Sequence, residues 1–124
     1  MFYEVDLAGV DLHSVNLEGS NFVSGRGANL AGTNFRGANL KNVKFAGRLE
    51  RANFDDAVFD WRSTFIGARV EGATFRHATL RDAKLDGADW SGVDFRGADL
   101  EGATFYGFMG LINGVEGGAR HPLS

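Results

Sequence analysis

Few residues in this chain could carry catalysis or bind a metal. It contains 3 histidines, His13, His77 and His121, and no cysteine, so a disulfide, a thiol nucleophile and a cysteine-ligated metal are all excluded. No histidine has the neighbouring partners that a metal site or a catalytic triad requires. Asp55 and Asp56 are adjacent in the chain, whereas paired catalytic carboxylates must face each other across a cleft. We therefore expect a protein that is not an enzyme and that needs no metal or cofactor.

The composition of the 124 residues indicates a single folded domain of modest size. It combines 18 glycines and 1 proline with 11 phenylalanines and a hydrophobic content of 44%, which is unlike collagen and too apolar for a disordered glycine-rich tract. The formal net charge of −3 argues mildly against a nucleic-acid-binding protein. The first residues, MFYEVDLAGVDL, lack the features of a signal peptide, and no apolar run approaches the length of a membrane span. These features predict a cytoplasmic protein without direct contact to nucleic acid or membrane.

Large apolar residues return at every fifth position, as Trp90, Phe95, Leu100 and Phe105 do in the stretch GADWSGVDFRGADLEGATF. An α-helix would spread such residues around its surface, because five residues advance the side chain by about 140° at roughly 100° per residue. A straight strand would place successive ones on opposite faces, because its side chains alternate with a period of two. The chain must therefore turn once in every repeat. We call each recurring large residue a centre; the centres run from Leu7 to Phe105.

The other positions of the repeat indicate how the turn is made. A small residue, usually alanine, stands two positions before the centre, and a polar residue, often Asn or Asp, stands between them. The small residue and the centre share one side of a short extended segment and point inward, while the polar residue points outward. Of the 18 glycines, 12 stand two positions after a centre, where a tight turn favours a residue without a Cβ. We expect the Asn and Asp side chains to fix this corner by hydrogen bonds to nearby backbone.

Extended segments joined by corners, with one apolar wall facing inward, predict a solenoid whose coils are joined by backbone hydrogen bonds. If four repeats complete one coil, Phe predominates in two of the stacked columns and aliphatic residues in the other two, as close packing favours. An alternation of two repeats would sort the residues similarly, so the pattern indicates an even number of sides. The columns are Leu7, Leu30, Leu49, Val70 and Trp90; Leu12, Phe35, Phe54, Phe75 and Phe95; Leu17, Leu40, Phe59, Leu80 and Leu100; and Phe22, Phe45, Phe65, Leu85 and Phe105.

Repeats such as ANLAG, ADWSG, VDFRG and ADLEG resemble those of the pentapeptide-repeat family, and the resemblance covers nearly all of residues 5–107. It implies an all-β fold, a right-handed quadrilateral β-helix with four repeats per coil and about five coils, spanning residues 1–107. Residues 108–124 are expected to end in a flexible tail, after a segment that either caps a monomer or joins two chains in a homodimer, as quinolone-resistance members of the family suggest. The apolar residues of that segment are Phe108, Met109, Leu111, Ile112 and Val115.

Three intervals depart from the five-residue period. Residues 22–30 are three residues too long, residues 45–49 are one too short, and residues 59–65 are one too long. Insertions of this size are expected to bulge at corners, where they are tolerated or carry function. The last insertion is expected to expose the side chains of Asp60, Trp61 and Arg62. The Trp61 indole is expected either to stack on the Arg62 guanidinium or to contact a partner.

The outward positions must carry any function, because a filled β-helix offers no cavity for a substrate. The residues that follow the centres of one Phe column form a mostly apolar stripe, which can mark a contact site: Tyr3, Val23, Ala46, Ile66, Asp86 and Tyr106. The opposite face carries a mostly basic line at the same position of the repeat: His13, Arg36, Asp55, Arg76 and Arg96. We therefore predict a non-enzymatic protein-binding module or scaffold that presents rigid faces to a protein partner.

The resemblance implies an alternative, a DNA mimic that binds DNA gyrase or topoisomerase IV and protects against quinolones or related toxins. Such a protein needs a row of negative charge comparable to a phosphate backbone. Arg81, Lys84 and Arg96 interrupt the acidic residues near the C-terminal end, and corner hydrogen bonds should occupy some of the carboxylates, so we place mimicry second. Those acidic residues are Asp82, Asp86, Asp89, Asp94, Asp99 and Glu101. A third interpretation is an engineered or minimal structural repeat protein.

Overall fold

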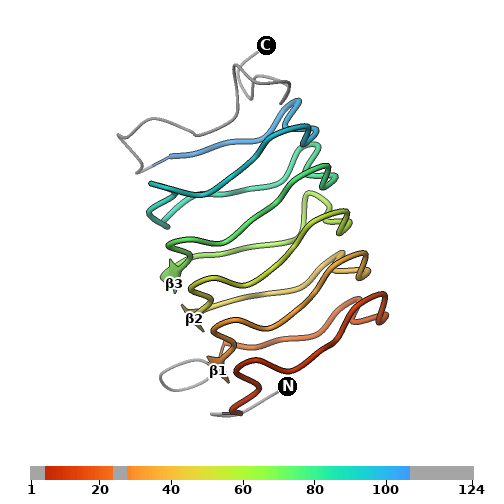
Figure 1. Cartoon of the computed structure of the whole chain (residues 1–124). Coiled ribbons are helices and arrows are strands. Elements are labelled where there is room, and N and C mark those ends of the chain that lie inside the picture. Colours follow the sequence, from red (N-terminus) through yellow and green to blue (C-terminus); the bar gives the residue numbers. More distant parts are fainter. Residues whose placement is uncertain (1–4, 24–27, 107–124) are drawn as a thin grey trace.

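The chain winds into successive stacked coils in the computed structural model, which describes residues 5–23 and 28–106 (Figure 1). Three short strands, β1 (Ala28–Asn29), β2 (Gly47–Arg48) and β3 (Ala68–Arg69), form a parallel sheet in the order β1-β2-β3. Isolated parallel bridges continue this pairing along the described chain, which contains no helix. The predicted β-helix type of fold is therefore confirmed. The expected boundary after residue 107 lies outside the described residues.

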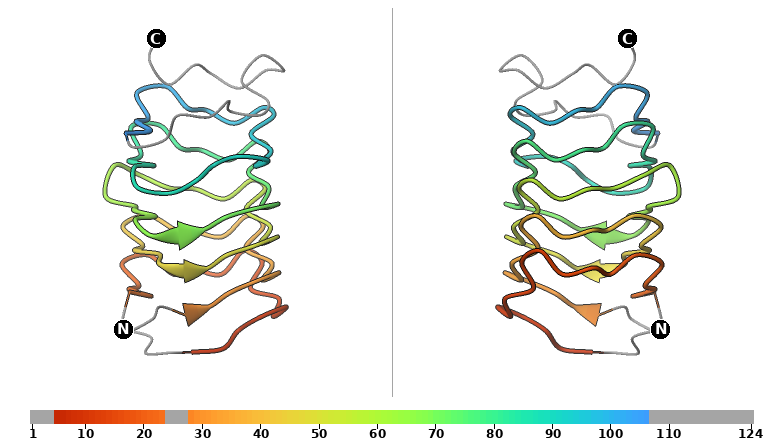
Figure 2. Two further views of the ribbon diagram at one scale, coloured as in Figure 1. Left: turned by 90° about the vertical axis from the view of Figure 1, so that its left-hand side faces the viewer. Right: turned by 90° about the vertical axis from the view of Figure 1, so that its right-hand side faces the viewer.

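The bridges join the residues that directly precede the centres, most of them polar, and they follow the predicted columns. Asp11 pairs with Asn34, and Asn34 pairs with Asn53 in the next coil. The backbone hydrogen bonds have the same register, since the Leu30 amide donates to the Arg48 carbonyl at 2.8 Å. The same pattern of bridges runs through the other three columns. The predicted stacking of residues is therefore confirmed, with the corners of successive coils lying above one another (Figure 2).

Tight turns form the corners of each coil. The Ala38 amide donates to the carbonyl of the centre Phe35 at 3.0 Å, and Gly37 between them has a φ of 69°. A turn of this kind requires a positive φ at its third residue, which glycine adopts without steric cost. Every predicted corner glycine within the described residues has a positive φ. Where glycine is missing, other residues adopt the same conformation: Ser14, Asn42, Arg51, Asp56, His77 and Asp82.

The Asn and Asp residues before the centres fix these corners, as predicted. Asn34 Oδ1 accepts a hydrogen bond from the Arg36 amide at 3.0 Å, two residues further along the chain. The three acidic residues that precede the last described corners do the same, since Asp89, Asp94 and Asp99 accept from backbone amides at 3.0, 3.0 and 3.1 Å. Much of the polarity of the repeat is therefore used inside the fold.

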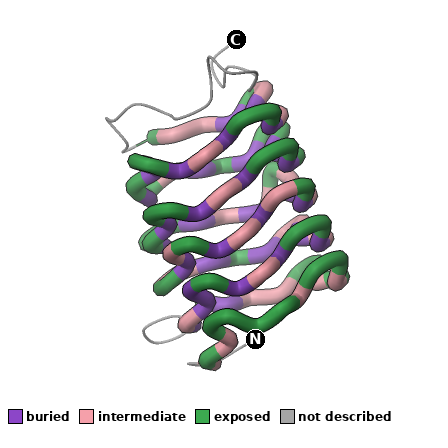
Figure 3. Tube along the Cα trace, viewed as in Figure 1, coloured by how far each residue is buried: buried purple, intermediate pink, exposed green. Residues whose placement is uncertain are grey.

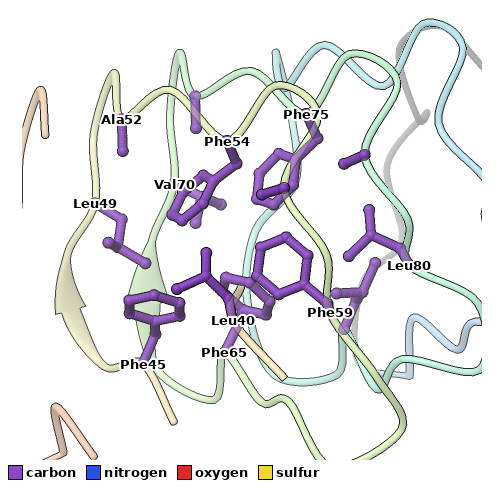
Figure 4. Close-up of a cluster of buried hydrophobic side chains, with 14 of the residues drawn as sticks. Leu40, Phe45, Leu49, Ala52, Phe54, Phe59, Phe65, Val70, Phe75 and Leu80 are labelled. Carbon is purple, nitrogen blue, oxygen red and sulfur yellow. The ribbon is translucent and has the colours of Figure 1, made fainter. Parts of the chain in front are cut away.

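The centres and the small residues fill the interior of the coils, while the corners are exposed (Figure 3). Phe54 stacks between Phe35 and Phe75, with ring centroids 5.0 and 4.6 Å apart. Figure 4 shows the Phe54 and Phe75 rings side by side in the core. Two buried hydroxyls stand at positions where most repeats have a small apolar residue, and both are satisfied by carbonyls of the preceding coil: Thr33 Oγ1 donates to Leu7 O at 2.8 Å and Ser63 Oγ to Leu40 O at 2.9 Å. The interior of the described coils is a packed hydrophobic core.

Candidate functional site

One column of corners carries the exposed apolar side chains that the sequence predicts. We call it the apolar edge; it consists of Val23, Ala46, Ile66, Asp86 and Tyr106. Val23, Ile66 and Tyr106 are 43%, 65% and 74% exposed, whereas Ala46 and Asp86 are half-buried. Tyr3, which was expected to extend the stripe, lies outside the described residues, as do Phe108, Met109, Leu111, Ile112 and Val115.

Backbone hydrogen bonds hold the corners of the apolar edge against one another. The Gly67 amide donates to Gly87 O, and the Gly87 amide donates to Tyr106 O, both at 3.1 Å. A Cβ placed on Gly87 would lie 3.3 Å from Cγ2 of Ile66, so this side chain packs over the bare backbone of the next corner. Ile66 is thus supported from one side and remains accessible from the other, which is the arrangement expected of a contact residue.

Asp86 interrupts the edge for a structural reason that the sequence did not reveal. Its Oδ1 accepts hydrogen bonds from Thr104 Oγ1 and from the Tyr106 amide in the next coil, both at 2.8 Å. Thr104 stands where most repeats have Asn or Asp, so the Tyr106 amide obtains its acceptor from the coil before. Asp55 does the same for the Arg76 amide at 2.9 Å. In the sequence, this role is indicated by two residues together: a Thr directly before one centre, and an Asp directly after the centre that stacks on it one coil earlier.

Replacing Asp86 with alanine is expected to lower the free energy of unfolding by about 1–2 kcal/mol, because the Tyr106 amide loses its acceptor. Asp86→Asn keeps an oxygen at the same place and should cost less. Chemical denaturation of both variants measures the difference. Equal losses would mean that the carboxylate charge, and not the hydrogen bond, stabilises this corner.

The insertion at residues 59–65 forms a corner that extends beyond its neighbours (the yellow-green segment in Figure 2). Trp61 is 61% exposed, and the Arg62 guanidinium lies 5.9 Å from the centroid of its indole ring, as the local-stacking interpretation requires. The expectation that Asp60 and Arg62 are also exposed is wrong, since both are half-buried. The Asp60 carboxylate accepts hydrogen bonds from the Asn42 amide at 3.0 Å and the Arg62 amide at 2.9 Å, as well as from the guanidinium. Burial opposes its ionisation, yet these hydrogen bonds lower the pKa of Asp60 below its ordinary value.

Arginines neutralise much of the acidic row near the C-terminal end. Asp94 lies 2.7 Å from Arg96, and Arg81 lies 3.2 Å from Asp99 and 3.4 Å from Glu101. The basic line opposite the apolar edge is paired in the same way, because Arg36 contacts Asp56, Arg76 contacts Asp55, and Arg96 contacts Asp94. Neither face therefore presents a continuous row of one charge. The sequence had placed these arginines among the acids but could not show which pairs form.

The Arg96 guanidinium, by hydrogen bonding, holds the pKa of the Asp94 carboxyl below its ordinary value, although burial opposes this. Because its pKa is lower in the folded state, Asp94 contributes stability above its unfolded pKa of about 3.9, and this stability is lost as the pH falls through the folded value. Asp94→Asn keeps the corner acceptor and should flatten the loss of stability below about pH 4. Urea unfolding across the acid range measures this slope. Asp82→Asn is the control, because the Asp82 carboxylate forms no ion pair within the described residues. If stability falls equally steeply with pH in both variants, Asp94 is not the source of the acid-dependent loss.

A further group of polar residues surrounds His13. His13 Nδ1 lies 2.8 Å from Asp11 Oδ1, but both side chains are exposed. An open hollow beside them is lined by polar residues, and its charged pair, Arg36 and Asp56, is joined at 3.2 Å. Within residues 5–23 and 28–106, no group of three or more His, Asp or Glu side chains is placed to hold a metal ion. The same residues include no helix long and apolar enough to cross a membrane.

Comparison with known proteins agrees with the repeat geometry. A family model described as pentapeptide repeats in 9 copies matches residues 28–79, and a second, in 8 copies, matches residues 73–108. Together they span residues 28–108, which is more than half of the 124-residue chain. No curated protein sequence matches the chain.

Solved structures with a similar fold are pentapeptide repeat proteins. Rfr23 from the cyanobacterium Cyanothece 51142 has a TM-score of 0.62 at 23% identity, over 83% of this chain and 85% of its own. A protein from the thylakoid lumen of Arabidopsis thaliana has a TM-score of 0.57 at 25% identity, over 80% and 70%. QnrB1, a plasmid-mediated fluoroquinolone resistance protein, has a TM-score of 0.53 at 16% identity, over 86% of this chain and only 63% of its own. With its five-residue period, its stacked columns and two matching family models, the chain belongs to the pentapeptide-repeat family.

Proposed function

We propose that this chain is a non-enzymatic protein-binding module that recognises its partner through the apolar edge. The observation that carries the proposal is the exposure of Val23, Ile66 and Tyr106 along one column of corners. Scattered apolar residues are ordinary on protein surfaces, but residues aligned on a rigid scaffold can contact one partner together. The scaffold in this proposal is the right-handed quadrilateral β-helix of about five coils that the family resemblance implies, acting in the cytoplasm.

The surroundings of the edge favour it over the other surfaces. The corner line of His13, Arg36, Asp55, Arg76 and Arg96 is occupied by hydrogen bonds and ion pairs within the molecule. A partner binding there would have to replace those interactions. At the edge, by contrast, it would cover apolar surface and would need to break none of the described ion pairs, so burial there contributes directly to affinity.

Site-specific photo-crosslinking tests this proposal. Benzoylphenylalanine placed at position 66 should give a defined protein adduct in extracts of the source cells, because Ile66 lies in the middle of the apolar edge. The same group at position 61 or 91 is the matched control, since Trp61 and Ser91 are exposed on other corners. Adducts of equal yield from all three positions, or none from position 66, would reject the edge as the binding site.

The DNA-mimic alternative makes a different demand on the surface. It needs unpaired carboxylates in a row, whereas Asp94, Asp99 and Glu101 contact arginines of the same chain. The likeness to QnrB1 supports the fold only. We therefore expect no inhibition of gyrase supercoiling and no protection from a quinolone in the presence of the purified protein. Protection that is abolished by Asp94→Lys with Glu101→Lys would instead assign the function to the acidic row and to a type II topoisomerase.

A further inference from the structure

Basic residues flank the apolar edge on both sides of Ile66. The extended segment that leads into this corner carries Lys44 and Lys84 on either side of Thr64 in its column of bridges. The segment that leaves the corner carries Arg48 and Arg69, which are paired in register between β2 and β3. All four basic side chains belong to exposed residues. The corner of Ile66, the most exposed aliphatic residue of the edge, thus lies between two extended segments whose columns carry four basic residues.

These charges are more available than the arginines on the other faces. Lys44, Lys84 and Arg69 form no ion pair within the described residues, and Lys44 Nζ has only a long contact of 3.4 Å to Asn42 Oδ1. Arg48 Nε lies 3.6 Å from Glu50 Oε1, too far for a hydrogen bond, and that oxygen has no hydrogen-bond partner. By contrast, Arg62, Arg76 and Arg96 contact carboxylates at 2.7–3.1 Å.

Asp86 is the one acidic residue that belongs to the edge itself. It keeps its negative charge, and its Oδ1 accepts hydrogen bonds from Thr104 Oγ1 and from the Tyr106 amide in the next coil. Asp6 and Asp89 stand at the two described ends of the column that holds Arg48 and Arg69, and Asp89 pairs directly with Arg69. The middle of the edge therefore combines an aliphatic contact with positive charge, in a protein whose net charge is −3.

We propose that the partner is an acidic polypeptide segment that places an apolar side chain on Ile66 and carboxylates against Lys44, Arg48, Arg69 and Lys84. This inference rests on the proposed function, because it names the class of partner for the same edge. Charge complementarity supplies the argument: charges around an apolar contact set specificity and raise the association rate. Nucleic acid fits less well, since phosphate binding relies on many cations, and those available here surround an aliphatic residue.

Selection of displayed random peptides on the purified protein tests the inference. Enriched peptides should combine Asp or Glu with large apolar residues, and their affinity should fall as salt is raised. The double variant Lys44→Glu with Arg69→Glu should weaken binding of a selected peptide by at least about tenfold. Its control is Lys41→Glu with Arg51→Glu, which makes the same change of charge on other corners with cations that also form no ion pair in the described residues. Circular dichroism and thermal unfolding show whether each variant is folded.

The outcomes separate this inference from the proposed function. Ile66→Ser reports on the edge itself. If Ile66→Ser abolishes binding while the Lys44 and Arg69 variant binds as well as its control, the edge is the site and the acidic partner is rejected. If neither variant weakens binding, both proposals fail. Enrichment of basic or neutral peptides, the absence of any enriched peptide, or tighter binding of oligodeoxythymidylate or anionic vesicles than of acidic peptides would also overturn the inference.

Discussion

Replacing Trp90 with alanine is expected to lower the free energy of unfolding by about 3–5 kcal/mol, as for other large aromatic residues in protein cores. The Trp90 side chain is fully buried. Its indole meets Phe65 and Phe75 edge-on, with centroids 5.2 and 5.6 Å apart, and Phe95 at 5.6 Å. Losing these ring contacts adds to the cost of losing buried area, because the surrounding rings cannot all move inward to fill the cavity that alanine would leave.

A hydrogen bond from the indole adds a second contribution. Trp90 Nε1 donates to the carbonyl of Leu85 at 2.7 Å. In the corresponding corner one coil earlier, the carbonyl of Phe65 accepts from the Ala68 amide at 2.9 Å, so the indole supplies the donor that a corner carbonyl needs. Trp90 therefore both fills the core and closes a turn.

Denaturant unfolding of Trp90→Ala and Trp90→Phe separates the two contributions. Phenylalanine keeps most of the ring contacts but removes the donor, so we expect a loss of about 1–2 kcal/mol for this variant. Far-UV circular dichroism is the suitable signal, because the substitution also removes a fluorophore. A loss below 1 kcal/mol for alanine would contradict the inward position of Trp90 and the register of its column.

Most of the fold could be predicted from the sequence because each position of the repeat has a single physical requirement. A centre such as Phe54 must point inward, Gly37 must accept a positive φ, and Asn34 must accept a hydrogen bond from its own corner. These demands are local and repeat in every coil. Stacking then followed from counting repeats, even across the intervals of irregular length.

What the sequence could not predict depends on contacts between coils. Asp55 and Asp56 are adjacent in the chain, yet Asp55 binds Arg76 and Asp56 binds Arg36, in opposite directions along the solenoid. Which neighbour each carboxylate meets depends on side-chain conformations at the corner, and these are not encoded by the five-residue period. The basic residues around Ile66 were missed for a similar reason, since Lys44 and Arg69 come from different coils and different sides.

Replacing Phe54 with alanine should also cost about 3–5 kcal/mol, and the comparison with Leu12 tests how stability is distributed along the solenoid. The Phe54 ring stacks on Phe35 and Phe75 and is fully buried. Leu12 occupies the same column in the first described coil, but it is only partly buried. Leu12→Ala should therefore cost less, about 1–2 kcal/mol.

Hydrogen exchange distinguishes a graded solenoid from a single cooperative unit. Each coil contacts mainly its neighbours, so a defect in the first coil should release that coil alone, whereas a defect at Phe54 separates the coils before it from those after it. We expect Leu12→Ala to accelerate exchange of the amides of residues 5–22 selectively, and Phe54→Ala to accelerate exchange throughout the described chain. Phe54→Leu, which retains an aliphatic side chain, should behave more like the unmodified protein. Uniform acceleration in both alanine variants would mean that the coils unfold together, and that the apolar edge is held by the whole stack and not by the coils adjacent to Ile66.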